Sequence, residues 1–456
     1  MNFELHQASA FEWQRSGRLK LAASQLLPLA LGLLCSLSSA VGQSLLLSGA
    51  TVHTVTGETL SPGQVLIQNG KIAAVGTTVP NNGVTPLDLT GQHLYPGIIS
   101  LDCALGLIEI EAVRATADAK EVGDYTPDVE SWIAINPDSE LLPVARANGI
   151  AYFEPVPTGG IVSGQSGLLT IAGWTAEAMA IRKPVALHLF WPTMELNTTP
   201  PEKVPGKNKP KALEEQSKER REALRSMMDF FAEAAAYAKA RSAAEKQNAP
   251  APETVPAWEA MLPYIRGDLP ITIHADEIRQ IKSAVTWAST NHYKIILAGA
   301  RDAWKVPELL ASNHVSVIYE HTFTQPVRES DSYDVQFTAP ALLHKAGMDV
   351  SFAIGLRPFD APTVRNLPYA AAQAVAFGLP EDEAVKGLTL YPARLAGVAD
   401  RLGSIDVGKE ATLFSSDGSI LDIRANVKHM WIAGKEVSLD NRHTRLYEKY
   451  KNRPKS

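Results

Sequence analysis

The sequence has very few cysteines for a chain of its length. Only Cys35 and Cys103 occur among 456 residues, and we expect Cys35 to be removed with an N-terminal export signal. One remaining cysteine cannot form an internal disulfide, although exported proteins commonly contain disulfides. Cys103 lies in an apolar run, which favours a small buried side chain over a reactive thiol.

An excess of positive charge is also absent. The chain has 43 Lys and Arg against 49 Asp and Glu, a formal net charge of -6, so no basic surface for nucleic acid is predicted. No Gly-x-Ser-x-Gly elbow is present, and the Gly159–Gly167 loop lacks the Lys of a phosphate-binding loop and the spacing of a dinucleotide fingerprint. The length suits one large domain plus a small one.

The N-terminal segment has the three parts of an export signal. Arg15, Arg18 and Lys20 precede an apolar run over residues 21–37, and small residues follow up to residue 42. We therefore predict that residues 1–42 are a cleaved signal peptide, that the mature protein is secreted or periplasmic, and that it leaves the membrane after cleavage. The alternative is an uncleaved signal that anchors the chain in the membrane; the short run and its proline argue against it.

Both ends of the mature chain are rich in short strand-like segments. Residues 43–95 contain short apolar or alternating runs and the hairpin signal Asn69-Gly70. Residues 400–440 have the same texture. The two ends therefore predict one composite β-sandwich, with a C-terminal tail over residues 441–456.

Residues 96–399 alternate strand-like and helix-like segments. The predicted strands are 98–101, 151–156, 185–190, 271–274, 294–299, 315–319 and 350–354. This alternation favours a parallel α/β architecture, and its length fits a (β/α)8 barrel. A polar segment at about 198–262 breaks the rhythm. It predicts a helical insertion with one long helix over residues 211–246, whose apolar stripe suits packing or oligomerisation better than a substrate lid.

Four stretches of the chain form a recognisable set. They are Leu94–Gly97, Ile273–Ala275, Thr389–Gly397 and Leu402–Ala411. Together they resemble the amidohydrolase superfamily, in the branch related to imidazolonepropionases, over nearly all of residues 44–440. The resemblance implies a (β/α)8 barrel with the composite sandwich and a pocket at the C-terminal ends of the barrel strands. It also implies hydrolysis of C–N bonds with one or two divalent ions.

Most of the metal ligands that the resemblance implies are replaced. The family carries His-x-His on its first strand, where this chain has Asp102 and Ala104. The first middle-strand histidine is present as His274, whereas no histidine follows strand 294–299 and Ile354–Arg357 stands where a last-strand Asp is expected. The resemblance therefore predicts the fold and leaves metal binding open.

A reduced metal centre can still be assembled from the residues present. His188 lies near the expected place of a bridging lysine, so Asp102, His188 and His274 form a candidate ligand set, with Glu320 or His321 as further candidates. Carboxylate and imidazole ligands suit zinc, manganese or iron. The cofactor is thus either one divalent ion or none, and in the second case His188 is a hydrogen-bonded core residue. We predict His274 and Asp102 as the catalytic residues.

Substrate contacts are predicted on the same face of the barrel. Gly160 and Ser163 belong to the glycine-rich loop, whose backbone N–H groups can cradle an anion or a carbonyl oxygen. Asp302 and Arg357 follow strands where family ligands are missing and form a candidate charged clamp. The alternatives are a tight βα turn for the loop and mutual ion pairs for the charged residues.

Two functional hypotheses follow. In the first, the protein is an exported hydrolase that acts on a C–N bond of an amide, a peptide-like or a cyclic amide substrate at a degenerate metal site. In the second, it is a metal-free pseudoenzyme that binds a small molecule or supports a catalytic paralogue as a subunit. A small-molecule substrate, a homo-oligomer and a complex with a related amidohydrolase are the expected partners. Metal-free catalysis by a carboxylate pair is a third idea.

Overall fold

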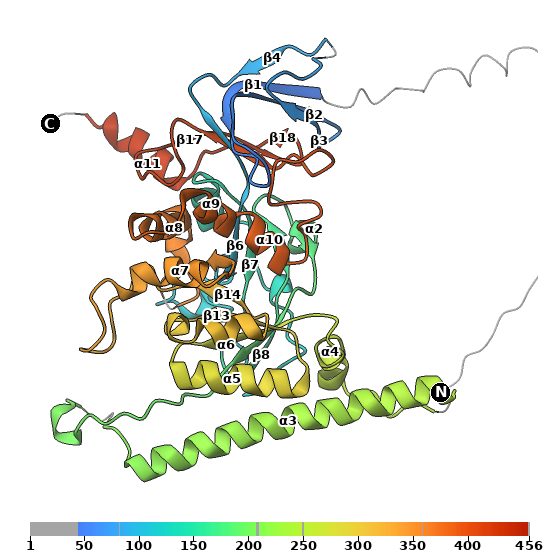
Figure 1. Cartoon of the computed structure of the whole chain (residues 1–456), viewed down its shortest axis with the longest axis vertical. Helices are drawn as coiled ribbons and strands as arrows, with labels where there is room; N and C mark the ends of the chain where they lie inside the picture. The colour runs from blue at the N-terminus through green and yellow to red at the C-terminus, as the bar shows by residue number, and fades with distance from the viewer. Residues whose placement is uncertain (1–43, 82, 207–208, 249, 358, 455–456) are drawn as a thin grey trace, which may run out of the picture. The chain divides into compact units, whose positions relative to one another are not determined.

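The computed structural model describes residues 44–81, 83–206, 209–248, 250–357 and 359–454 (Figure 1). The predicted signal peptide lies outside these residues. Within the described ranges, no helix is both long enough and apolar enough to cross a membrane.

Strands from both ends of the described chain form one eight-stranded sheet. Its strands are β1 (Ser44–Val52), β2 (Leu60–Gln68), β3 (Lys71–Gly76), β4 (Pro86–Asp88), β5 (His93–Pro96), β16 (Leu413–Ser416), β17 (Val427–Ile432) and β18 (Lys435–Glu436). Their order is β18-β17-β16-β5-β1-β2-β3, and β4 pairs with β1. Strand β16 runs antiparallel to β5, with Leu413 opposite Pro96. A two-layer sandwich as such stays a prediction.

The predicted hairpin turn at Asn69-Gly70 is confirmed. Gln68 of β2 pairs with Lys71 of β3, and the two turn residues have φ angles of 52° and 77°. A two-residue turn of this kind needs positive φ at both positions, which Asn and Gly adopt at little cost.

The middle of the chain folds into a barrel-like α/β structure. Its parallel strands are β6 (Ile98–Cys103), β7 (Ile150–Pro155), β11 (Leu187–Phe190), β12 (Ile271–Ala275), β13 (Ile295–Gly299), β14 (Ser316–Tyr319) and β15 (Val350–Phe352). Strands β11 to β15 pair in sequence order and β6 pairs with β7. A parallel bridge from Leu101 to Ala353 connects the β15 end back to β6.

The barrel departs from eight parallel strands between β7 and β11. Strands β8 (Val162–Gln165), β9 (Leu168–Thr170) and β10 (Ala180–Arg182) occur there, with β8 antiparallel to β11 and β9 antiparallel to β7. The segment between them contains four glycines between residues 159 and 167. Because β8 and β9 pair antiparallel with their neighbours, the fold is mixed at this point.

Helices follow the strands and cover the barrel. They are α1 (Leu141–Arg146), α2 (Ala176–Met179), α5 (Ile278–Asn291), α6 (Pro307–Ser312), α7 (Val335–Lys345), α8 (Leu367–Ala376), α9 (Glu381–Leu388), α10 (Leu390–Leu395) and α11 (Arg442–Lys451). Short 3-10 helices are η1 (Arg114–Thr116), η2 (Ser131–Ile133), η3 (Pro201–Lys203), η4 (Ala303–Lys305) and η5 (Ala361–Asn366). The segment expected to be a C-terminal tail therefore contains α11, which the Asn441 side chain caps.

The insertion consists of one long helix and one short helix. Helix α3 (Leu213–Gln247) runs beside α5, and α4 (Pro256–Ile265) lies next to it (Figure 1). The buried side of α3 includes Met227, Phe231, Ala234 and Ala238, as its apolar stripe predicts. Phe231 meets Trp287 of α5 edge-on, with ring centroids 4.8 Å apart. Packing is therefore one role of this helix.

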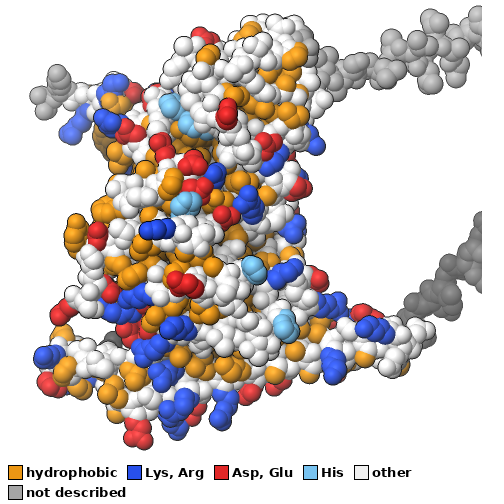
Figure 2. All heavy atoms as spheres, in the orientation of Figure 1, with side chains coloured by type: hydrophobic (Ala, Val, Ile, Leu, Met, Phe, Trp, Pro, Cys, Tyr) orange, Lys and Arg blue, Asp and Glu red, His pale blue; other side chains and the backbone are white. Residues whose placement is uncertain are grey.

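The surface carries both signs of charge. Figure 2 shows acidic and basic side chains interspersed over the face that it draws. Ion pairs between such exposed groups contribute little stability individually.

The packing of α3 can be tested by truncating its most buried aromatic side chain. Phe231 is 2% exposed, so Phe231→Ala should lower the free energy of unfolding by about 3 kcal/mol, because contacts are lost and a cavity remains. Urea denaturation measures the change. Met228, its neighbour on the same helix, is 41% exposed, and Met228→Ala is the control with little expected loss. Equal losses for the two variants would contradict the packing role.

Candidate metal centre

Asp102 stands near the C-terminal end of the first barrel strand in an unusual backbone conformation. Its φ is 54°, in the left-handed region that Asp adopts more readily than most residues. The side chain is fully buried, and neither carboxylate oxygen has a hydrogen-bond partner among the described residues. Strained backbone together with an orphaned carboxylate is typical of a functional position.

The two predicted histidines converge with Asp102. His188 of β11 and His274 of β12 lie on neighbouring parallel strands, and His188 Nδ1 is 3.0 Å from His274 Nε2. His274 Nδ1 is 3.7 Å from Asp102 Oδ2. One ligand atom from each of the three residues lies within 4.8 Å of the other two. His188 is fully buried, whereas the His274 side chain is 9% exposed and stacks on Phe190.

Glu154 is a site residue that the sequence analysis missed. It lies on β7, and its Oε1 is 3.7 Å from His188 Nε2. Ser166 Oγ donates a hydrogen bond of 2.6 Å to Oε1, and the Asp102 backbone N–H donates one of 3.2 Å to Oε2. A charged residue inside the apolar segment 151–156 was the available signal, because buried carboxylates are rare unless they have a partner.

The electrostatics of the centre are dominated by burial and by close carboxylates. Burial, then the neighbouring Glu320 and Glu154, raise the pKa of Asp102 well above its usual range. Burial, then His188, hold the pKa of His274 well below its usual range, so this imidazole is neutral near pH 7. Among the described residues, no Lys or Arg forms an ion pair with Asp102, Glu154 or Glu320. The described part of the chain therefore supplies no fixed cation to these carboxylates.

The residues fit a divalent metal ion. Asp102 Oδ1 and Oδ2 are buried without hydrogen-bond partners in the described structure, and His188 and His274 each bring a ring nitrogen within 4.8 Å of that carboxylate. One carboxylate and two imidazoles make a donor set that zinc, manganese or iron accepts. Three protein ligands are also the number that catalytic zinc sites use, because one position stays open for water or substrate.

Apart from Asp102, the described positions of the missing family ligands hold no side chain of the converging ligand group. Ala104 and Ala300 are fully buried, and a Cβ on Gly355 would lie 2.3 Å from a Val364 methyl group. His321, the alternative ligand, is engaged elsewhere: its Nε2 is 2.6 Å from Asp276 Oδ1 and its Nδ1 is 3.1 Å from an Arg357 nitrogen. Burial raises the pKa of Asp276, but the hydrogen bond and charge of His321 outweigh it and lower the value to about 2.

Two of the predicted substrate contacts are used within the protein. Asp302 is fully buried and accepts two hydrogen bonds from Arg328, at 2.9 and 2.6 Å, and one from the Ile278 backbone. The Ser163 hydroxyl donates to the Gly159 carbonyl. Gly160 is exposed, has a φ of 72°, and leaves no space for a Cβ beside the Gly123 carbonyl. Arg357 is exposed next to His321. None of these four residues is in the converging ligand group.

The comparisons with known proteins identify the family. The model of the amidohydrolase family matches residues 175–437. An amidohydrolase structure from Thermotoga maritima MSB8 superposes with a TM-score of 0.75 at 25% identity, covering 86% of this chain and 99% of that chain. The chain therefore belongs to the amidohydrolase family.

Two curated relatives match this chain less extensively than the Thermotoga structure does: one over a shorter stretch and one at lower identity. An imidazolonepropionase from Brucella anthropi is 25% identical over 146 residues, which are 32% of this chain and 35% of the relative. The amidohydrolase tasK from Hapsidospora irregularis is 21% identical over 398 residues, which are 82% of this chain and 39% of the relative. The matches thus span well under half of the length of either relative.

The structural role of Asp302 can be tested by neutralising it. Asp302→Asn should cost about 2 kcal/mol of folding free energy, because it removes a charged bidentate partner from Arg328. Urea denaturation at pH 7 measures the loss. Asp382→Asn, which removes a 69% exposed partner of Lys386, is the control with little expected change.

Wild type and Asp302→Asn can also be compared as a function of pH, and the direction of the expected change in stability is defined. Burial raises the pKa of Asp302, but hydrogen bonds from Arg328 and the charges of Arg328 and Lys305 lower it overall. A carboxyl group with a lowered folded-state pKa contributes stability above its unfolded pKa of about 3.9 and loses it as the pH falls. The stability difference between wild type and Asp302→Asn should therefore shrink below about pH 4. A constant difference down to pH 3 would contradict the ion-pair role.

Proposed function

We propose that the protein is a hydrolase that cleaves a C–N bond of an amide, a peptide-like or a cyclic amide substrate. A single divalent ion, held by Asp102, His188 and His274, is the proposed cofactor. Membership of the amidohydrolase family supports the reaction class. The observation that carries the proposal is the convergence of three ligand atoms within 4.8 Å beside carboxylates that no described Lys or Arg neutralises.

Each residue has a distinct part in this proposal. A bound divalent ion would supply a Lewis acid that polarises a carbonyl group and activates water. Asp102, His188 and His274 would each donate a lone pair to the ion. Glu154, fixed by Ser166 and the Asp102 N–H, faces His188 Nε2 and orients that ring, as carboxylates next to ligating histidines do.

Glu320 is the group placed to move a proton. It is half-buried after β14, its Oε1 has no hydrogen-bond partner in the described structure, and it acts on the pKa of Asp102. A carboxylate in that setting can take a proton from attacking water and return it to the leaving nitrogen. Because His274 is the one proposed ligand with an exposed fraction above zero, the substrate would approach from its side.

Export of the mature protein is part of the same proposal. The basic flank, apolar run and small-residue exit of residues 1–42 support it. The substrate would then be met outside the cytoplasm.

A metal-free pseudoenzyme is the second candidate, and one contact favours it. The 3.0 Å hydrogen bond between His188 and His274 already engages one nitrogen of each ring. In that case the barrel would bind a small molecule, or support a catalytic relative or a second copy as a subunit.

Metal content separates the two candidates. The first predicts close to one equivalent of zinc, manganese or iron in protein purified without chelator, measured by elemental analysis. His274→Ala should reduce it severalfold, because two remaining ligands hold a divalent ion poorly. His344→Ala, which removes a histidine with 37% side-chain exposure on α7, should keep the ion. Metal-free protein that stays so after incubation with excess ion would favour the pseudoenzyme.

The role of Glu320 gives a separate activity prediction. Metal-loaded protein should hydrolyse members of a panel of N-acyl amino acids, dipeptides and cyclic amides. Glu320→Gln should lower kcat about 100-fold, the usual range for loss of a general base, while the metal content is unchanged. Unchanged kcat in this variant would remove Glu320 from the mechanism, and loss of metal would make it a ligand instead.

A further inference from the structure

A cavity opens at the end of the barrel opposite the metal centre. Its volume is about 470 Å³, within the usual range for small-molecule sites. Ile295 and Ser316 on its wall are the first residues of β13 and β14, and Pro270 precedes β12. His274 lies four residues beyond Pro270, which is about 13 Å along an extended strand. The cavity is thus separate from the proposed reaction site.

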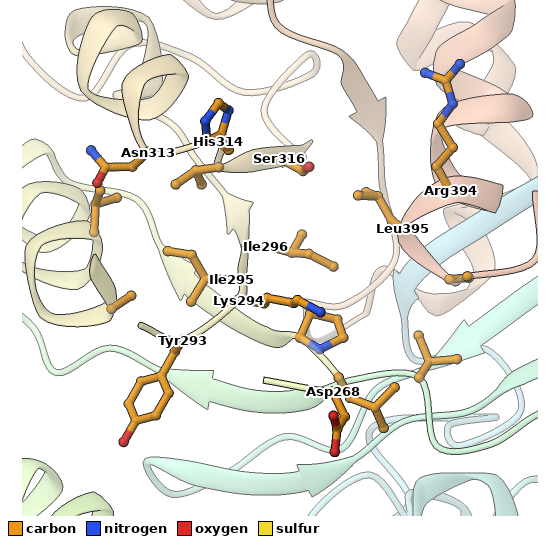
Figure 3. A pocket seen from close by; sticks show the side chains of 18 of the residues that line it. Asp268, Tyr293, Lys294, Ile295, Ile296, Asn313, His314, Ser316, Arg394 and Leu395 are labelled. Atoms are coloured by element: carbon orange, nitrogen blue, oxygen red, sulfur yellow. The ribbon is translucent and has the colours of Figure 1, made fainter. Parts of the chain in front are cut away.

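The wall of this cavity has more positive than negative groups. Arg182, Lys294 and Arg394 line it, against Asp268 as the carboxylate. Arg394 is paired with Asp349 at 2.8 Å. Among the described residues, no carboxylate lies within the 4.0 Å ion-pair distance of Arg182 or Lys294. In Figure 3, Lys294, a lining residue of the cavity, lies between Ile296 and Asp268. An anion is the ligand that such an unbalanced pair of cations favours.

The remaining wall is suited to an apolar body. Val285, Ala288, Ile296 and Val315 are almost completely buried and line the cavity. Ser289, Asn313 and Ser316 add neutral polar groups. An apolar wall with a few polar groups is typical of sites for small organic molecules. An inorganic ion would leave the apolar part of the wall without a contact.

The lack of a side chain at Gly397 leaves space for the guanidinium group of Arg182. Gly397 has a φ of 67°, and a Cβ there would lie 3.2 Å from the Arg182 guanidinium carbon. The guanidinium group therefore lies against bare backbone at the wall of the cavity. A larger residue at this position would have to displace it.

We propose that this cavity binds a small organic anion, a carboxylate or a phosphate monoester on an apolar body. Lys294 and Arg182 hold the anionic group, and the apolar wall formed by Val285, Ala288, Ile296 and Val315 holds the body. The site is independent of the proposed hydrolase centre and would exist equally in a metal-free protein.

Methyl NMR of the full chain locates the ligand. Benzoate and phenyl phosphate are the anionic probes. Benzamidine, which has the same phenyl ring but a positive charge, is the control ligand. Saturable shifts are expected at Ile295 and Ile296 but not at Ile273, which precedes His274 on β12. A Kd of about 1 mM or tighter is expected for probes of this size. The two anionic probes distinguish a carboxylate site from a phosphate site.

Variants test the charge assignment. Lys294→Ala should raise the Kd at least tenfold, and Arg182→Ala should also weaken binding. Lys345→Ala, which removes an exposed lysine on α7, should leave the Kd unchanged. The folded methyl spectrum serves as the check that each variant is intact. Shifts at Ile273 alone, equal binding of benzamidine, an unchanged Kd in Lys294→Ala, or no saturation well above 1 mM would each overturn the proposal.

Discussion

The register between two neighbouring parallel strands decides what this barrel can hold at its C-terminal end. Phe190 of β11 pairs with His274 of β12. Side chains alternate between the two faces of a strand, so His188, two residues before Phe190, lies on the same face as His274. A slip of one residue would turn His188 to the opposite face. The 3.0 Å contact between the imidazoles and the stacking of Phe190 on His274 both depend on this register.

Charge balance is the second constraint on the site. Burying a carboxylate is costly unless a proton, a cation or several hydrogen bonds compensate it. Asp102, Glu154 and Glu320 are close enough to influence one another, and only Glu154 has well-placed donors, from Ser166 and the Asp102 N–H. Without a cation, protons must neutralise the buried negative charge. The raised pKa of Asp102 shows that this carboxyl group binds a proton more readily than usual. A divalent ion would instead let Asp102 stay ionised next to His274, so the charge of the site and the geometry of its ligands both favour a metal ion.

Much of the fold could be predicted from local patterns, because period-two and helical apolar patterns lie within single segments. The parallel strands and the Asn69-Gly70 hairpin are of this kind. The antiparallel strands β8 and β9 were not predicted, since their pairing depends on partners distant in sequence, β11 and β7. The site divides in the same way. His274 and Asp102 follow from motif positions. The sequence marks Glu154 only as a charge in an apolar segment, and the β6–β7 pairing is needed to place it beside Asp102.

The surviving sequence motif and the altered ligands are explained by different physical requirements. Gly97 follows Pro96, where the chain passes from β5 of the sheet to β6 of the barrel. A Cβ at Gly97 would lie 2.5 Å from the Ala151 Cβ and 2.9 Å from a Thr412 methyl group, and the Gly97 N–H donates to the Thr412 carbonyl. This glycine is therefore needed for packing between sheet and barrel, whatever the site binds. Asp102 and Ala104 stand further along the chain, at the end of β6 where the site lies, so the motif can identify the fold while the side chains beyond it define a different donor set.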